Sequence, residues 1–143
     1  MSVAAASMQA GHFEGGKAGK RMLWAGRVLS ALIVLLMTMS GAMNLAHPPQ
    51  MVEMFTGKYG YPKSVMLALG LVELACAVLY AVPRTAVLGA ILLTGYLGGA
   101  VATHVRVSEA FLIPLVVGVI VWAGLFLRDE RLRALLPLRR PVR

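Results

Sequence analysis

The sequence predicts an all-α integral membrane protein, a four-helix bundle with helices running alternately up and down and both termini in the cytoplasm. Hydrophobic residues make up 59% of the 143 residues and charged residues only 14%, whereas soluble domains carry about 25% charged residues. Four apolar segments each approach the ~20 residues that cross the bilayer hydrocarbon. A soluble bundle would carry charged stripes on its helices. We predict spans at 24–46, 64–82, 85–104 and 110–127.

Lysine and arginine are divided unevenly between the two ends of the predicted bundle. Ten of them precede the first span, lie between the second and third spans, or follow the fourth; three lie in the other two connections. Positively charged connections stay in the cytoplasm, so this division places both termini inside. It predicts a multi-pass protein of the bacterial cytoplasmic (inner) membrane. The net charge of +8 then faces anionic lipid headgroups and does not indicate nucleic-acid binding.

The sequence divides into three parts. Residues 1–21 are rich in alanine and glycine without periodicity, which predicts a disordered cytoplasmic leader. Residues 22–128 form the four-helix transmembrane domain, and residues 129–143 form a basic cytoplasmic tail. An alternative is that the first apolar segment is a secretory signal, cleaved near the small residues 40–42, which would leave three spans. The length of the segment favours retention.

The connections predict which helices are neighbours. Pro48 and Pro49 end the first helix, since proline supplies no N–H. The connection 47–63 is the only long one, and we expect one short interfacial helical turn within it. The connection at Pro83 and Arg84 is so tight that the second and third helices must be antiparallel neighbours. Residues 105–109 make another short hairpin.

Glu73 lies in the middle of the second span. A charged carboxylate there costs about 2.5–3.5 kcal/mol by insertion scales unless it is paired, hydrated or protonated. Helical spacing places Gly70 one turn before it and Ala77 one turn after it on the same face. Small residues mark helix contacts in membranes, so Glu73 is expected to face the bundle interior.

Several polar residues are candidate partners of Glu73. Thr38 and Tyr96 are expected at a similar depth, while Asn44 and His104 lie at the outer ends of their helices, above it. Arg27 is an alternative ion-pair partner, although its position near the cytoplasmic end favours the headgroups. Two interpretations stay open: a protonatable site lining a proton, ion or quinone-headgroup pocket, or a structural interhelical hydrogen bond. The histidines lack metal-ligand spacing, so no metal site is predicted.

Glycines predict where the helices pack. Gly41 and Gly70 lie on the expected inner faces of the first and second spans. The Gly95-x-x-x-Gly99 motif on the third span predicts an internal contact with the second span, with a homodimer seam as the alternative. The single cysteine, Cys76, excludes an internal disulfide.

Several short motifs together resemble the DoxX-like family of small bacterial membrane proteins. They are Gly41-x-x-Asn44, Gly60-Tyr61-Pro62, Gly70-x-x-Glu73, Pro83-Arg84, Gly99-Ala100-x-x-x-His104 and the charged run 127–133. The resemblance implies four transmembrane helices and no assigned activity. It also implies a link to quinone oxidoreduction, so quinone enters as a cofactor by resemblance only. Many relatives carry lysine where this chain has Asn44, and that departure removes one cationic partner for Glu73.

Three functions follow from these observations. The first is a non-catalytic membrane subunit or scaffold with a buried polar site around Glu73, binding a membrane redox partner or a second copy. The second is a quinone-linked oxidoreductase component, although no cofactor ligands are evident in the sequence. The third is a small proton-coupled transporter in which Glu73 is the coupling residue.

Overall fold

The computed structural model describes residues 3–135, and the side chains of residues 19–133. The chain forms helices and no strand within this range. The elements are α1 (Val3–Ala46), α2 (Pro49–Glu53), the π-helical turn η1 (Met54–Lys58), α3 (Ser64–Ala81), α4 (Ala86–Arg106), α5 (Leu112–Arg128) and α6 (Glu130–Leu135).

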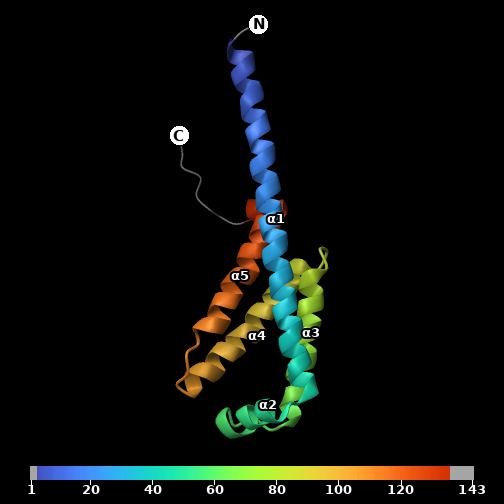
Figure 1. The fold of residues 1–143 in the computed structure, drawn as a ribbon, viewed down its shortest axis with the longest axis vertical. Coiled ribbons are helices and arrows are strands. Elements are labelled where there is room, and N and C mark those ends of the chain that lie inside the picture. The colour runs from blue at the N-terminus through green and yellow to red at the C-terminus, as the bar shows by residue number, and fades with distance from the viewer. Residues whose placement is uncertain (1–2, 136–143) are drawn as a thin grey trace.

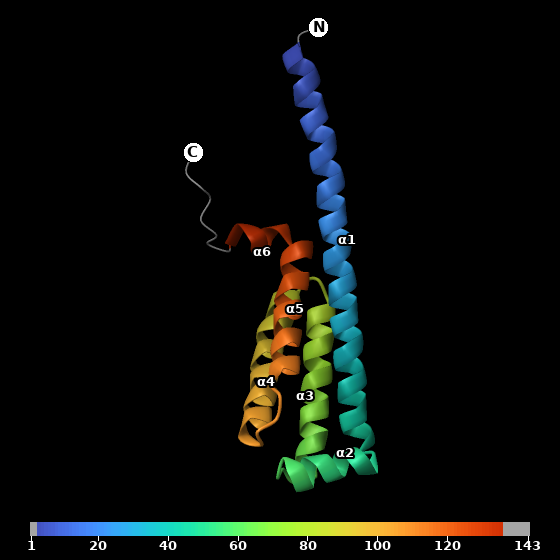
Figure 2. The ribbon, with the colours of Figure 1, turned by 60° about the vertical axis from the view of Figure 1, so that its left-hand side comes forward.

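The long helices form a bundle in which each packs on two neighbours. α1 packs on α3 and α5, and α4 packs on the other sides of α3 and α5. Successive long helices run in opposite directions, so α1 enters and α5 leaves at the same end of the bundle (Figure 1). The up-and-down arrangement predicted from the short connections is therefore observed. α2 and η1 lie across the opposite end (Figure 2), where the sequence predicts an interfacial turn.

The predicted spans agree closely with the helices. α3, α4 and residues 19–46 of α1 are each long and apolar enough to cross a membrane. α5 is equally apolar but has 17 residues, which corresponds to about 25 Å of helix and the lower end of what spans a bilayer. Three or four of the helices are thus suited to a membrane bundle.

α1 begins earlier than the sequence predicts. The structure continues this helix to Val3, through residues for which we predict a disordered leader. Extending an existing helix requires no new nucleation, and this alanine-rich stretch has no proline before Pro48 to stop it. The division into leader, transmembrane domain and tail stays a prediction; residues 136–143 of the tail lie outside the described residues.

Glycines set close helix contacts, and the structure places Gly41 and Gly70 at one of them. A Cβ atom added at Gly70 would lie 3.0 Å from the carbonyl oxygen of Gly41, so α1 and α3 cross with their backbones nearly touching. Gly89 permits a similar approach between α3 and α4, because its Cβ would lie 2.3 Å from the amide nitrogen of Tyr80. No pattern in the sequence singles out Gly89.

The internal contact predicted for Gly95 and Gly99 is wrong. A Cβ atom added at Gly95, Gly98 or Gly99 would meet nothing within 4 Å among the described residues. The buried face of α4 is instead formed by Ala86, Gly89, Ala90, Leu93 and Leu97. The glycine motif lies on the outward side of α4, because helical periodicity places it away from this buried stripe.

Candidate functional site: an intramembrane carboxylate

Glu73 is the central residue of a buried polar site. Its exposed fraction is 1%, and the buried face of α3 also contains Met66, Gly70, Ala77 and Tyr80. The predicted inner face of the second span is therefore confirmed. Since Gly70 lets α1 approach closely one turn away, polar groups on α1 are brought within reach of the carboxylate.

Two donors from different helices bind the same oxygen of Glu73. The Asn44 side-chain nitrogen on α1 donates to Oε2 at 3.1 Å, and the Tyr96 hydroxyl on α4 donates to Oε2 at 2.7 Å. The carboxylate thus links three helices, α1, α3 and α4. Both donors are neutral, so the site holds its acid by hydrogen bonds and not by an ion pair.

One acceptor at this site has no partner. The Asn44 side-chain oxygen Oδ1 is buried and lacks a hydrogen-bond partner among the described residues. An unpaired buried acceptor costs about 1–3 kcal/mol. Asn44 Oδ1 can therefore accept one more hydrogen bond. The donor would be a protonated carboxyl group or a group on a bound molecule.

The remaining predicted site residues do not join this group. Thr38 is exposed on the outer surface of α1. Arg27 lies toward the other end of α1, with its guanidinium carbon 5.8 Å from the centre of the Trp24 ring. His104 belongs to a separate polar cluster at the end where α2 lies, described next.

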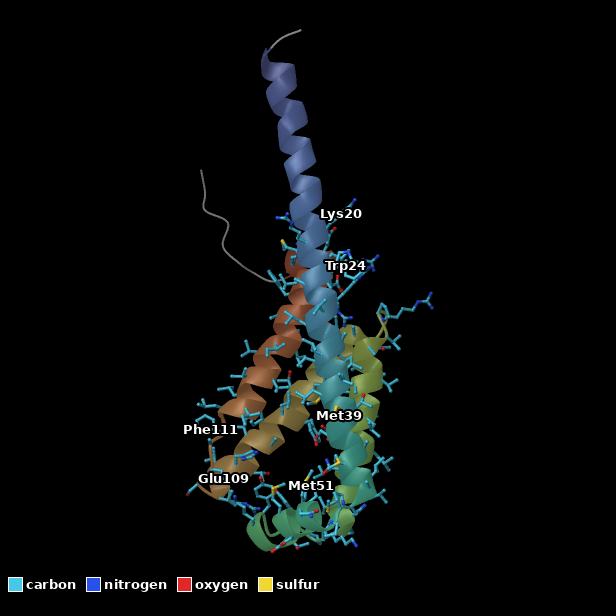
Figure 3. The ribbon with its side chains drawn as sticks, viewed as in Figure 1. Lys20, Trp24, Met39, Met51, Glu109 and Phe111 are labelled. Atoms are coloured by element: carbon cyan, nitrogen blue, oxygen red, sulfur yellow. The ribbon has the colours of Figure 1, made fainter. Side chains whose placement is uncertain are left out.

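The outer cluster consists of Lys58, Tyr59, His104, Arg106 and Glu109. Lys58 forms an ion pair with Glu109. The Tyr59 hydroxyl donates to Glu109 Oε2 at 3.1 Å, and His104 Nδ1 lies 3.2 Å from the same oxygen. Arg106 donates to the backbone carbonyl of Tyr59. These contacts fasten the α2–η1 segment to the connection between α4 and α5 (Figure 3).

The groups of the outer cluster shift each other's pKa values. The hydrogen bond from Lys58 is the main cause that lowers the pKa of the Glu109 carboxyl below its ordinary value of 4.5. The same contact raises the pKa of Lys58 above 10.5. Burial, followed by the hydrogen bond to Glu109, raises the pKa of the Tyr59 hydroxyl above 10.0. All three groups lie outside the predicted spans.

A further polar contact inside the bundle was not anticipated. The Ser30 and Tyr80 hydroxyls lie 3.1 Å apart, and Tyr80 donates to the carbonyl of Val121 at 2.8 Å. Gly124 makes room for this contact, since its Cβ would lie 3.0 Å from the Ser30 oxygen. Tyr80 lies on the same buried face of α3 as Glu73, and its partners on α1 and α5 depend on how those helices cross.

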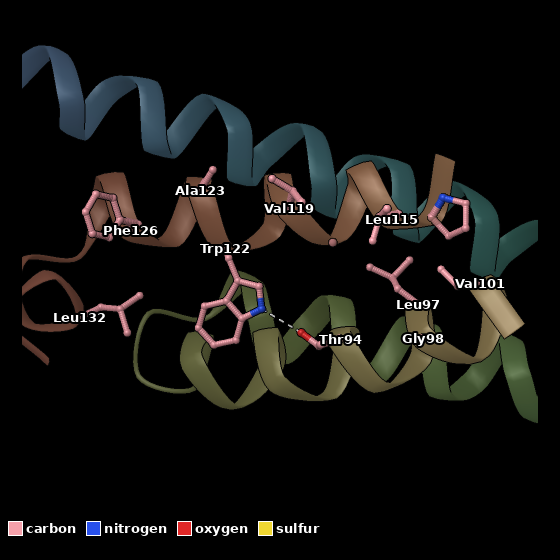
Figure 4. A pocket seen from close by; sticks show the side chains of 12 residues that line it. Thr94, Leu97, Gly98, Val101, Leu115, Val119, Trp122, Ala123, Phe126 and Leu132 are labelled. Carbon is pink, nitrogen blue, oxygen red and sulfur yellow. Dashed lines mark hydrogen bonds between the residues drawn. The ribbon is translucent and has the colours of Figure 1, made fainter. Parts of the chain in front are cut away.

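An apolar groove of about 660 Å³ lies between α4 and α5. Trp122 and Thr94 cross it near its middle, the indole N–H donating to the hydroxyl at 2.9 Å (Figure 4). Gly98 also lines the groove. Glu73 lines neither this groove nor the second described cavity, so the carboxylate and the cavities are separate features.

The fold and the buried site define a class: a small helical membrane protein with an intramembrane acid. The model of the DoxX-like family matches residues 28–124, which is more than half of the chain. The chain belongs to the DoxX-like family, as its short motifs indicated. No curated protein and no solved structure matches it. Among the described residues, no three His, Cys, Asp or Glu side chains group closely enough to hold a metal ion.

Proposed function

We propose that this protein is a non-catalytic membrane subunit in which the Asn44–Glu73–Tyr96 site joins three helices and α4 binds a second copy. The observation that carries the proposal is the binding of Glu73 Oε2 by donors from α1 and α4 at an exposed fraction of 1%. Such an arrangement satisfies a carboxylate that would otherwise be costly in hydrocarbon. Its purpose is then to fix the bundle geometry.

The experiment that tests a structural role is the substitution Glu73→Gln. The glutamine oxygen can still accept from Asn44 and Tyr96, and its NH2 group can donate to Asn44 Oδ1. A structural role therefore predicts that Glu73→Gln has nearly the same free energy of unfolding in bicelles as the wild type. It also predicts the same proton flux in proteoliposomes for both proteins. A proton flux in the wild-type protein that Glu73→Gln abolishes would contradict it. Glu73→Ala, which removes the acceptor, serves as the destabilised reference.

The glycine surface of α4, formed by Gly95, Gly98 and Gly99, supports assembly. These positions face outward with open space beside them, and small residues let membrane helices approach closely. The GxxxG spacing is self-complementary, which favours a second copy as the occupant. The wild-type protein is then a dimer.

Bulky substitution tests this assembly. A Cβ atom added at Gly99 would meet nothing within 4 Å among the described residues, so Gly99→Leu should leave the monomer folded and block the close approach of a second α4. Ala75→Leu, on the exposed surface of α3, is the matched control and should remain dimeric. Light scattering in detergent gives the mass of each variant and so distinguishes a monomer from a dimer. A monomeric wild type, or a dimer in Gly99→Leu, would overturn the assembly.

A proton-coupled transporter is the second candidate, favoured by one observation. The unpartnered oxygen of Asn44 adjoins the carboxyl group, so a proton taken up by Glu73 would find an acceptor nearby. The flux comparison with Glu73→Gln decides between the two functions. A quinone-linked role stays a prediction from the family resemblance, and a change in the carboxyl infrared band on adding ubiquinone would support it.

For orientation, we propose that the end bearing α6 faces the cytoplasm of a bacterial inner membrane. The uneven division of lysine and arginine supports this choice. Contacts of Gly41 and Ser30 with α3 support retention of the first span, since cleavage near residues 40–42 would remove both. An impermeant maleimide should label Lys58→Cys in intact cells and Arg84→Cys only after lysis; the reverse result would invert the topology.

A further inference from the structure

A second cavity lies at the end of the bundle where α6 begins. Its volume is about 320 Å³. It is lined by residues of α1, of the connection between α3 and α4 with the first residue of α4, and of the junction of α5 with α6. Figure 2 shows these elements at one end of the bundle. The lining residues are Leu23, Arg27, Pro83, Ala86, Leu125, Arg128, Asp129 and Arg131.

The charge lining this cavity is strongly positive. Arg27, Arg128 and Arg131 contribute three positive charges against the single negative charge of Asp129, a net of +2. Asp129 is already engaged, because its Oδ1 accepts from the backbone amides of Arg131 at 2.9 Å and Leu132 at 3.4 Å. Among the ion pairs of the described residues, none involves the three arginines. The cavity therefore carries uncompensated guanidinium charge.

One of the arginines, Arg128, is held by two contacts with Tyr80. Arg128 donates from Nη2 to the backbone carbonyl of Tyr80 at 2.9 Å, and its guanidinium carbon lies 4.9 Å from the centre of the Tyr80 ring. This contact uses one of the five guanidinium donors. The others remain for a ligand, and a fixed side chain loses little conformational entropy on binding.

We propose that this cavity binds a phosphate group. A planar guanidinium matches phosphate oxygens in a bidentate geometry, and arginine is the residue of choice for phosphate recognition. The cavity lies at the same end of the bundle as Trp24 (Figure 3), and tryptophan is enriched at the level of lipid headgroups. The phosphate belongs either to an anionic lipid or to a soluble molecule, and the experiment separates these sources.

The experiment measures lipid retention by the full chain with native mass spectrometry. The protein in detergent is titrated with phosphatidylglycerol, and separately with phosphatidylcholine, in the presence and absence of inorganic phosphate. The test variant is Arg27→Gln combined with Arg131→Gln, two exposed side chains outside the apolar core. The matched control is Arg133→Gln, on the same α6 helix, which pairs with Glu130 and does not line the cavity.

The proposal expects affinity for phosphatidylglycerol to fall about tenfold or more in the double variant and to stay unchanged in the control. Retention that inorganic phosphate does not displace identifies the lipid headgroup as the source. Displacement by phosphate, with equal loss of phosphate affinity in the double variant, identifies a soluble phosphate. Equal loss in the control would reveal a general basic surface and overturn the proposal, as would unchanged binding in both variants.

Discussion

Glu73 and Glu109 are two carboxylates bound in similar ways in very different surroundings. Each accepts a hydrogen bond from a tyrosine, Tyr96 at 2.7 Å and Tyr59 at 3.1 Å. Glu73 has an exposed fraction of 1% and receives its second hydrogen bond from the neutral amide of Asn44. The Glu109 side chain is 28% exposed and pairs with the cationic Lys58.

The difference follows from the cost of charge at each depth. At the outer end water solvates both members of an ion pair, so two long charged side chains meet there with little penalty but also contribute little. Within the hydrocarbon a lysine would need to be desolvated as well, and neutral donors satisfy the acid without a second buried charge. The depth of a carboxylate in the bundle therefore decides whether it pairs with a cationic side chain or accepts hydrogen bonds from neutral donors.

The largest expected difference is between Glu73→Ala and Glu109→Ala. Glu73→Ala leaves two interior donors without an acceptor, and we expect it to lower the free energy of unfolding by about 2–3 kcal/mol. Glu109→Ala should cost much less, because water replaces the lost contacts of Lys58. Unfolding by SDS in bicelles measures both. Equal losses of unfolding free energy would mean that water reaches Glu73, so that the two carboxylates would not differ in their surroundings.

The two tyrosines form a matched pair with an intermediate expected effect. Tyr96→Phe removes one of the two hydrogen bonds to Glu73 and should lower the free energy of unfolding by about 1–2 kcal/mol. Tyr59→Phe should have a smaller effect, since Glu109 keeps its ion pair with Lys58. The same unfolding assay applies. A larger loss of unfolding free energy in Tyr59→Phe than in Tyr96→Phe would show that the outer cluster contributes more to stability than the Glu73 site.

The smallest expected effects are those of pH and salt on the stability of the protein, and we expect Glu109 to cause them. Because the folded state lowers the pKa of Glu109 below 4.5, its contribution is present above that value and is lost as pH falls through the folded pKa. The raised pKa of Lys58 means that its contribution is present below 10.5 and is lost as pH rises through the folded pKa. Raising salt to about 1 M should weaken the pair by screening.

The measurement compares the stability of wild type and Glu109→Gln across these pH ranges and salt concentrations. The stability difference between the two proteins should shrink at low pH and at high salt. Tyr96→Phe serves as the control, since its difference from wild type should not respond to salt. A difference for Glu109→Gln that stays constant under all conditions would show that the ion pair between Lys58 and Glu109 does not form in the membrane-embedded protein.

The sequence by itself determined the local features of this protein. Apolar length located the spans, proline ended α1, and helical periodicity placed Gly70, Glu73 and Ala77 on one inward face of α3. These features depend on a few neighbouring residues, so a single sequence contains them. The short motifs also indicated the family correctly. The position of Glu73 in the second span indicated a buried polar site, with several candidate partners.

Only the tertiary structure decided which groups meet across helices. Thr38 and Asn44 were both candidates from the first span, and the crossing at Gly41 and Gly70 brings Asn44 to Glu73 while Thr38 faces outward. The same applies to the glycine motif of α4, beside which an added Cβ atom would meet nothing within 4 Å in the part of the chain that the structure describes. Helix tilt, rotation and axial offset set these contacts, and they arise from the packing of all four helices together. A periodic pattern fixes which residues share a face of one helix, but it contains no information on what that face will contact.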